Sequence, residues 1–142
     1  MSKFVTRTDH IHNLAEYQTS QEELRRKLGS LYLQHLYLWD SNYWYVSLED
    51  WGKVLKDVTF GMPKYTKERF DCSNFAMLTS ARVSETYKLN TCGICVGDSP
   101  WGYHGFNLIL AEDGLYYFEP QTGDVYSVTE NSGYRAHIVI IG

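Results

Sequence analysis

Three residues that lie far apart in the chain have the side chains of a thiol active site. Cys72 opens the segment CSNFAML, His104 opens HGFNLILA, and Glu119 closes LYYFE. A cysteine in the first turn of a helix lies where the helix dipole and the unpaired backbone amides favour negative charge. An imidazole can accept the thiol proton, and a carboxylate can orient that imidazole. These residue types predict Cys72 as nucleophile, His104 as general base and Glu119 as the orienting residue, with acyl transfer as the reaction.

Further polar residues are candidates for supporting roles in such a site. Gln121 is the rival of Glu119 for the orienting role, since it lies two residues further along. The backbone amide of Cys72 can hold the oxyanion of a tetrahedral intermediate, and Asn42 is a candidate for a second donor or a substrate contact. Asp71 is the expected N-cap of the helix, although its carboxylate opposes thiolate formation.

The three cysteines offer a competing interpretation as metal ligands. Three is an odd number, so free thiols are expected rather than a disulfide framework. Cys92 and Cys95 form a C-x-x-C pair, and with Cys72 and His104 they could supply the four ligands of a zinc site. However, the pair lies in an apparent strand, where side chains three positions apart point to opposite faces. We therefore expect no metal and no cofactor, and keep the zinc-structured module as an alternative.

The elements that must position these side chains begin with helical patterns. Ser20 and Glu23 form a capping box before residues 21–39, a predicted helix. The positions that return at helical spacing are Leu24, Leu28, Leu31, His35 and Leu38. A weaker box at Ser47 opens a second short helix through residue 58. The segment 72–87 is apolar around most of its first turns, which is typical of a buried helix.

After Asn90 the pattern changes to short β-type runs separated by turn residues. The sequences EDG at 112–114 and QTGD at 121–124 supply the glycines that hairpin turns require. The predicted fold class is therefore α+β, with N-terminal helices and a central buried helix packed on an antiparallel sheet. A chain of 142 residues suits a single domain, here an arm and helix at 1–40 and a core at 41–142.

Composition excludes several classes of partner. The formal net charge is -4, and the lysines and arginines are scattered, so neither nucleic acid nor an anionic membrane is an expected partner. No apolar run resembles a signal peptide or a membrane span, which predicts a cytoplasmic protein. The oligomeric state is left open.

Three segments also carry a family resemblance. DCSNFA, YHGFNLIL and YYFEPQTGDVY resemble the papain-like cysteine protease domain at the C-terminus of fungal agglutinins of the mushroom-lectin type and in related stand-alone bacterial and phage proteins. The similarity covers roughly residues 43–130, and residues 1–40 match nothing in that family. It implies a papain-like or transglutaminase-like fold and a triad of Cys72, His104 and Glu119. Since no lectin domain is attached, the family's carbohydrate targeting is not carried over.

The hypothesis from the sequence is a thiol-dependent acyl hydrolase, in the first place a cysteine peptidase with a Cys-His-Glu catalytic triad acting on a peptide or protein substrate. Transglutamination and deamidation would use the same groups, so the sequence does not separate these outcomes. A catalytically inactive papain-like binding protein is the first alternative, and the zinc-structured module is the second.

Overall fold

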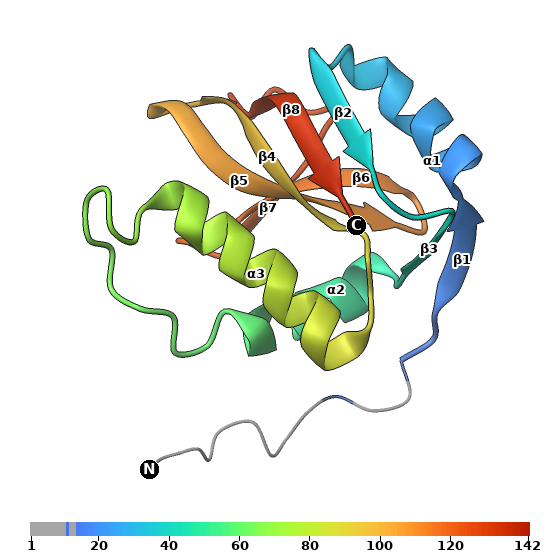
Figure 1. Cartoon of the computed structure of the whole chain (residues 1–142), viewed down its shortest axis with the longest axis horizontal. Coiled ribbons are helices and arrows are strands. Elements are labelled where there is room, and N and C mark those ends of the chain that lie inside the picture. Colours follow the sequence, from blue (N-terminus) through green and yellow to red (C-terminus); the bar gives the residue numbers. More distant parts are fainter. Residues whose placement is uncertain (1–10, 12–13) are drawn as a thin grey trace.

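The computed structural model of the protein describes residue 11 and residues 14–142. In this part of the chain, one sheet has the strand order β2-β8-β4-β5-β6-β7 and a smaller one has the order β1-β3. Helix α3 lies across one face of the large sheet (Figure 1). The elements are β1 (Tyr17–Ser20), α1 (Gln21–Leu28), the 3-10 turn η2 (Gly29–Leu31), β2 (His35–Leu38), β3 (Asn42–Tyr45), α2 (Leu48–Val58), α3 (Cys72–Tyr87), β4 (Cys92–Ser99), β5 (Gly102–Ala111), β6 (Gly114–Glu119), β7 (Asp124–Ser127) and β8 (Arg135–Ile141).

The first helix begins as predicted and ends early. The Ser20 side chain accepts the backbone N–H of Glu23 at 3.1 Å, which confirms the N-terminal cap. The predicted continuation to residue 39 is wrong, because His35–Leu38 forms β2 and pairs parallel with β8. This strand alternates exposed and half-buried residues, and its leucines pack against the core. Pairing with β8 therefore outweighs the helical spacing of the leucines.

Helix α3 begins at the predicted residue and is fixed to the sheet beneath it. The backbone N–H of its N-cap, Asp71, donates to the Asn74 side chain at 3.1 Å. From β5, the side-chain amide of Asn107 donates to the carbonyl of Ala76 in α3 at 2.9 Å and to that of Gly93 in β4 at 3.0 Å. One buried amide thus joins three elements and sets where the helix lies.

The hairpins after residue 90 are confirmed. Strand β4 pairs antiparallel with β5, β5 with β6, and β6 with β7. Gly114 and Gly123 stand at the predicted turns with φ of 145° and 86°, a backbone conformation that glycine adopts without strain. The β5-β6 hairpin brings the start of β5 next to the end of β6, where His104 and Glu119 lie.

The large sheet separates two hydrophobic clusters, and β4 contributes a cysteine to each. Cys92 packs with residues of α2 and α3, whereas Cys95 packs with residues of α1 and the opposite face. Both cysteines are buried and free. They point to opposite faces as predicted, and this geometry excludes the zinc site proposed for Cys72, Cys92, Cys95 and His104. Among the described residues, no group of three or more His, Cys, Asp or Glu side chains is placed to hold a metal ion.

The expected fold class needs correction. Strands dominate the described chain. The N-terminal part contains β1, β2 and β3, and β2 replaces the end of a predicted helix. The large sheet is mixed rather than antiparallel, because β2 runs parallel to β8. The helix from Cys72 covers one face of that sheet and leaves Met77 45% exposed, so it is not a central buried helix. The α+β, papain-like or transglutaminase-like arrangement with its helices first is therefore wrong.

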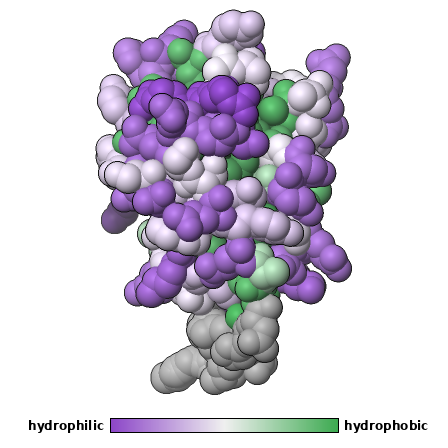
Figure 2. All heavy atoms as spheres, turned by 90° about the vertical axis from the view of Figure 1, so that its right-hand side faces the viewer, coloured by the Kyte–Doolittle hydropathy of each residue, from purple (hydrophilic) through white to green (hydrophobic). Residues whose placement is uncertain are grey.

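The outer surface on the side of α1 and β1 is mostly hydrophilic, with only scattered hydrophobic atoms (Figure 2). This agrees with α1 itself, which buries Leu24 and Leu28 and turns Glu22, Arg25 and Arg26 outward. Within the described chain, none of the helices combines the length and the apolar composition that a membrane span requires.

Candidate functional site

The centre of the candidate site is an imidazole–carboxylate pair. His104 Nε2 lies 2.7 Å from Glu119 Oε1, and the two side chains are 10% and 0% exposed. An ionised carboxylate only accepts hydrogen bonds, so the proton of this contact belongs to Nε2. The sequence predicted this pair, and the β5-β6 hairpin brings it together.

The Glu119 carboxylate has two more donors. The Tyr134 hydroxyl donates to Oε1 at 3.0 Å, and the backbone N–H of Gln121 donates to Oε2 at 3.1 Å. Burial, followed by the nearby charge of Glu119, raises the pKa of the Tyr134 phenol well above its ordinary value, so it remains a donor. Gln121 was predicted as a rival of Glu119, but the structure places its backbone on Glu119 and leaves its side chain exposed.

The sulfur of Cys72 lies beside the strand that carries the histidine. Cys72 is half-buried at the first position of α3, and the backbone N–H of Gly105 donates to its Sγ at 3.4 Å. This approach depends on glycine, because a Cβ at position 105 would lie 3.0 Å from the Cα of Ser73. The structure thus brings Cys72 next to the residue that follows His104.

Two aromatic residues complete the surroundings of the imidazole. The Trp101 ring meets the His104 ring edge to face at a centroid distance of 5.6 Å, and Trp101 is 64% exposed. The Phe106 ring stacks on the His104 ring at a centroid distance of 6.2 Å. Sequence reasoning missed Trp101 and Tyr134 as site residues. The turn PWGY before His104 could have indicated Trp101, whereas nothing in the sequence marks Tyr134.

Asn42, the other predicted supporting residue, belongs to a different cluster. It lies in β3 of the small sheet, and its carbonyl accepts the side-chain amide of Asn90 at 2.9 Å. That same amide donates to Asp40 at 2.9 Å. The predicted role of Asn42 as an oxyanion donor therefore has no support in the contacts of this residue.

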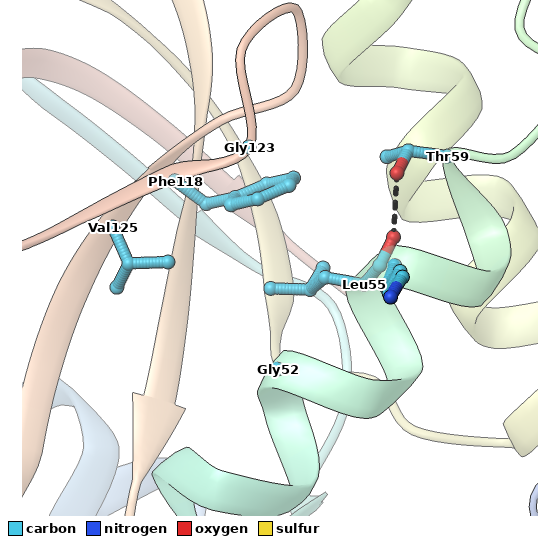
Figure 3. Close-up of a pocket in the computed structure, with 7 residues that line it drawn as sticks. Gly52, Leu55, Thr59, Phe118, Gly123 and Val125 are labelled. Atoms are coloured by element: carbon cyan, nitrogen blue, oxygen red, sulfur yellow. Dashed lines mark hydrogen bonds between the residues drawn. The ribbon is translucent and has the colours of Figure 1, made fainter.

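A separate pocket of about 300 Å³ lies between α2 and the β6-β7 hairpin (Figure 3). Leu55 and Phe118 point toward one another across it, and the Thr59 hydroxyl is already bonded to the Leu55 carbonyl at 2.7 Å. The lining residues are Gly52, Leu55, Lys56, Thr59, Phe118, Gly123 and Val125. None of them is a residue of the Cys72, His104 and Glu119 cluster, so the pocket is a distinct feature.

Comparisons with known proteins place these features in a family context. The model of the ricin-type beta-trefoil lectin C-terminal domain matches residues 11–141. Comparison with curated proteins gives no match. A solved structure described as a PSL1a-E64 complex aligns with a TM-score of 0.71 and 22% identity, covering 87% of this chain and 51% of the other. A Polyporus squamosus lectin bound to the human-type influenza-binding epitope Neu5Aca2-6Galb1-4GlcNAc aligns with a TM-score of 0.66 and 21% identity, covering 87% and 49%.

These findings correct the assignment made from the sequence. The matching family is named for a lectin, and one of the two structures is described as a lectin bound to a glycan, so the resemblance to a papain-like cysteine protease is overturned. The predictions of an enzyme, of a hydrolase and of a peptide or protein substrate are overturned on the same ground. The two structural likenesses concern the fold, and the chain spans about half the length of each solved structure it matches.

Proposed function

We propose that this chain, which belongs to the family of ricin-type beta-trefoil lectin C-terminal domains, is a carbohydrate-binding domain with its ligand site at Trp101 and His104, and with Glu119 orienting His104 from behind. Membership of the family follows from the match over residues 11–141. The observation that carries the proposal is the exposed ring of Trp101 beside the polar pair. A sugar ring has an apolar face of C–H groups and a rim of hydroxyls, so it needs an aromatic surface next to directional hydrogen-bonding groups.

The roles of the individual residues follow from their contacts. Since Nε2 of His104 is bound to Glu119, Nδ1 is the ring atom that remains for a ligand hydroxyl. Glu119 fixes the orientation of that ring, and Cys72 forms the neighbouring wall with a half-buried thiol. The exposed side chain of Gln121 offers one further polar contact. Asn42 is left out, because its contacts lie in another cluster.

The first ligand to test is the glycan named for the Polyporus squamosus lectin, Neu5Aca2-6Galb1-4GlcNAc. Titration calorimetry with this trisaccharide should show binding to the wild-type protein. Trp101→Ala should weaken it by about tenfold or more, the equivalent of about 1.4 kcal/mol of stacking. Trp39→Ala is the matched control, because Trp39 is also exposed, at 71%, but adjoins β2.

Two results would count against this proposal. Absence of binding to the wild type would contradict a site for this glycan on the chain. If the Trp101→Ala and Trp39→Ala variants bound the glycan as tightly as the wild type, the glycan site would lie away from His104.

A second candidate ligand is the compound E64, with which one of the matched structures is described as a complex. The observation that favours it is the position of Cys72, whose sulfur receives a backbone N–H at the first residue of a helix. Native mass spectrometry, which preserves non-covalent complexes, should show E64 bound to the wild type and binding lost or reduced in Cys72→Ala. Cys95→Ala is the control, since Cys95 is buried. Hydrolysis of a peptide by the wild type but not by Cys72→Ala would contradict a purely binding role.

A further inference from the structure

Tyr134 contacts both Glu119 and Trp101 of the candidate site. It lies one position before β8 and is 8% exposed. Its hydroxyl donates to Glu119 Oε1, the same oxygen that contacts His104. One carboxylate oxygen therefore receives a proton donor from each of two residues that are distant in sequence.

This shared oxygen restricts how the carboxylate can move. Glu119 is 1% exposed, and its Oε2 is held by the backbone N–H of Gln121 at 3.1 Å. With only the histidine on Oε1 and the Gln121 amide on Oε2, the carboxylate could still tilt about its Oε2 contact and follow the imidazole. The Tyr134 hydroxyl fixes the plane of the carboxylate independently of His104, so the imidazole must adopt the orientation that this plane allows.

The ring of Tyr134 supports a second part of the site. It meets the Trp101 ring at 6.4 Å and the Phe106 ring at 5.1 Å, both edge to face. The ring of Tyr126 stacks on it at a centroid distance of 5.3 Å. The Tyr134 hydroxyl thus binds the carboxylate of the polar pair, while the Tyr134 ring packs against the exposed tryptophan.

We propose that Tyr134 is a positioning residue that fixes Glu119 by its hydroxyl, and through Glu119 the tautomer and orientation of His104. The ligand part of this inference rests on the proposed function. The effect on His104 does not, because it follows from contacts within the protein. Tyr134→Phe separates the two contributions, since it removes the hydroxyl and keeps the ring against Trp101.

The test is an NMR measurement of the histidine ring nitrogens at neutral pH in the wild type, Tyr134→Phe and Tyr126→Phe. In the wild type, His104 should show the single tautomer in which Nε2–H donates to Glu119. In Tyr134→Phe the carboxylate is no longer fixed by the hydroxyl, so the signals of His104 should lose this single-tautomer pattern. Tyr126→Phe should keep it, because the donors to Glu119 from His104, Tyr134 and the Gln121 backbone are retained. The same ring-nitrogen pattern in the wild type and Tyr134→Phe would overturn the proposal.

A second measurement does not depend on a variant that folds. In the wild type, the Tyr134 hydroxyl proton should exchange slowly with solvent and give a resolved NMR signal, since it is buried on Glu119. A rapidly exchanging hydroxyl would overturn the inference. Glycan affinity is then a separate readout: a wild type that binds no glycan contradicts the proposed function, whereas the tautomer of His104 still tests the role of Tyr134.

Discussion

At Glu119 a nearly inaccessible carboxylate accepts hydrogen bonds from His104, Tyr134 and the backbone of Gln121. Glu119→Gln replaces one acceptor oxygen by an NH2 group, which must face a donor. We expect a loss of about 1–3 kcal/mol in the free energy of unfolding, the usual cost of an unsatisfied buried group. Urea denaturation at neutral pH measures it.

The matched control is Glu130→Gln. Glu130 also accepts a backbone N–H, from Ser127 at 2.8 Å, but it is exposed. Its substitution should change the free energy of unfolding by less than about 0.5 kcal/mol. Similar losses of free energy of unfolding in the two variants would show that burial does not make the Glu119 hydrogen bonds more stabilising than exposed ones.

The buried thiol of Cys92 should make the free energy of unfolding fall at alkaline pH. Burial raises the pKa of the Cys92 thiol from 9.0 to about 12. Below pH 9 the thiol is protonated in both states, so stability is intact. Between about pH 9 and pH 12 the unfolded chain loses this proton while the folded one keeps it, and stability falls by up to about 1.4 kcal/mol per pH unit.

The measurement compares the wild type with Cys92→Ala by chemical denaturation between pH 8 and pH 11. The alanine variant is less stable at pH 8 because of its cavity. The difference in free energy of unfolding between the wild type and this variant should narrow as the pH rises. Val83→Ala is the control, since Val83 is buried in the same cluster and has no proton to lose. A gap that stays constant for Cys92→Ala would show that the thiol is not protected from ionisation.

Residue type alone was enough to find the groups with distinctive chemistry. Cys72, His104 and Glu119 were predicted from their types and order, and the structure shows the His104–Glu119 contact directly. Tyr134 was missed because its hydroxyl reaches Glu119 only through packing of the segment before β8 on the sheet. Asn42 was proposed on chemistry, although its strand lies in another sheet.

At the scale of elements, the start of α3 packs closely against β5 at Gly105. A methyl group at position 105 would lie 3.0 Å from the Cα of Ser73 and 3.2 Å from its nitrogen, and both are backbone atoms. Gly105→Ala should therefore push the helix from the strand and cost about 1–3 kcal/mol. It should also change the alkylation rate of Cys72, because its contact with the Gly105 amide is lost.

Gly52→Ala is the control for this prediction. Gly52 lies inside α2, and a Cβ there meets nothing within 4 Å. Replacing an unconstrained helical glycine by alanine should stabilise the protein by up to about 1 kcal/mol. Thermal denaturation and timed alkylation distinguish the two variants, and a Gly105→Ala protein as stable and as reactive as the wild type would disprove the close packing.

Elements were predictable where local signals agree with tertiary pairing. The caps at Ser20 and Asp71 and the glycine turns after residue 111 lie within a few residues of the structure they determine. His35–Leu38 was misassigned because its partner, β8, is about a hundred residues away and leaves no local mark. Short segments of alternating leucines fit both periods, so distant pairing decides between them.

At the scale of the whole molecule, local motifs were a poor guide to the family. The segments that suggested a papain-like peptidase cover residues 43–130, whereas the lectin C-terminal family model covers residues 11–141. The N-terminal elements α1 and β2 contribute side chains to the core, and they lie in residues 1–40, the part that matched nothing in the papain-like family. Site chemistry and fold family are separate properties, and the match over the whole chain decides the second.

Ligand binding at the proposed site should stabilise the whole molecule by mass action. A ligand at about 100 times its Kd adds about 2.7 kcal/mol to the free energy of unfolding. For a chain of this length that raises Tm by roughly 5–10 °C. Calorimetric scans with Neu5Aca2-6Galb1-4GlcNAc should show this full shift in the wild type and in Trp39→Ala. In Trp101→Ala the shift should fall to about half or less, because a tenfold higher Kd leaves about 1.4 kcal/mol of stabilisation at the same ligand concentration. A shift of the same size in Trp101→Ala would mean that the sugar binds the folded protein elsewhere, because binding at any site of the native state raises Tm.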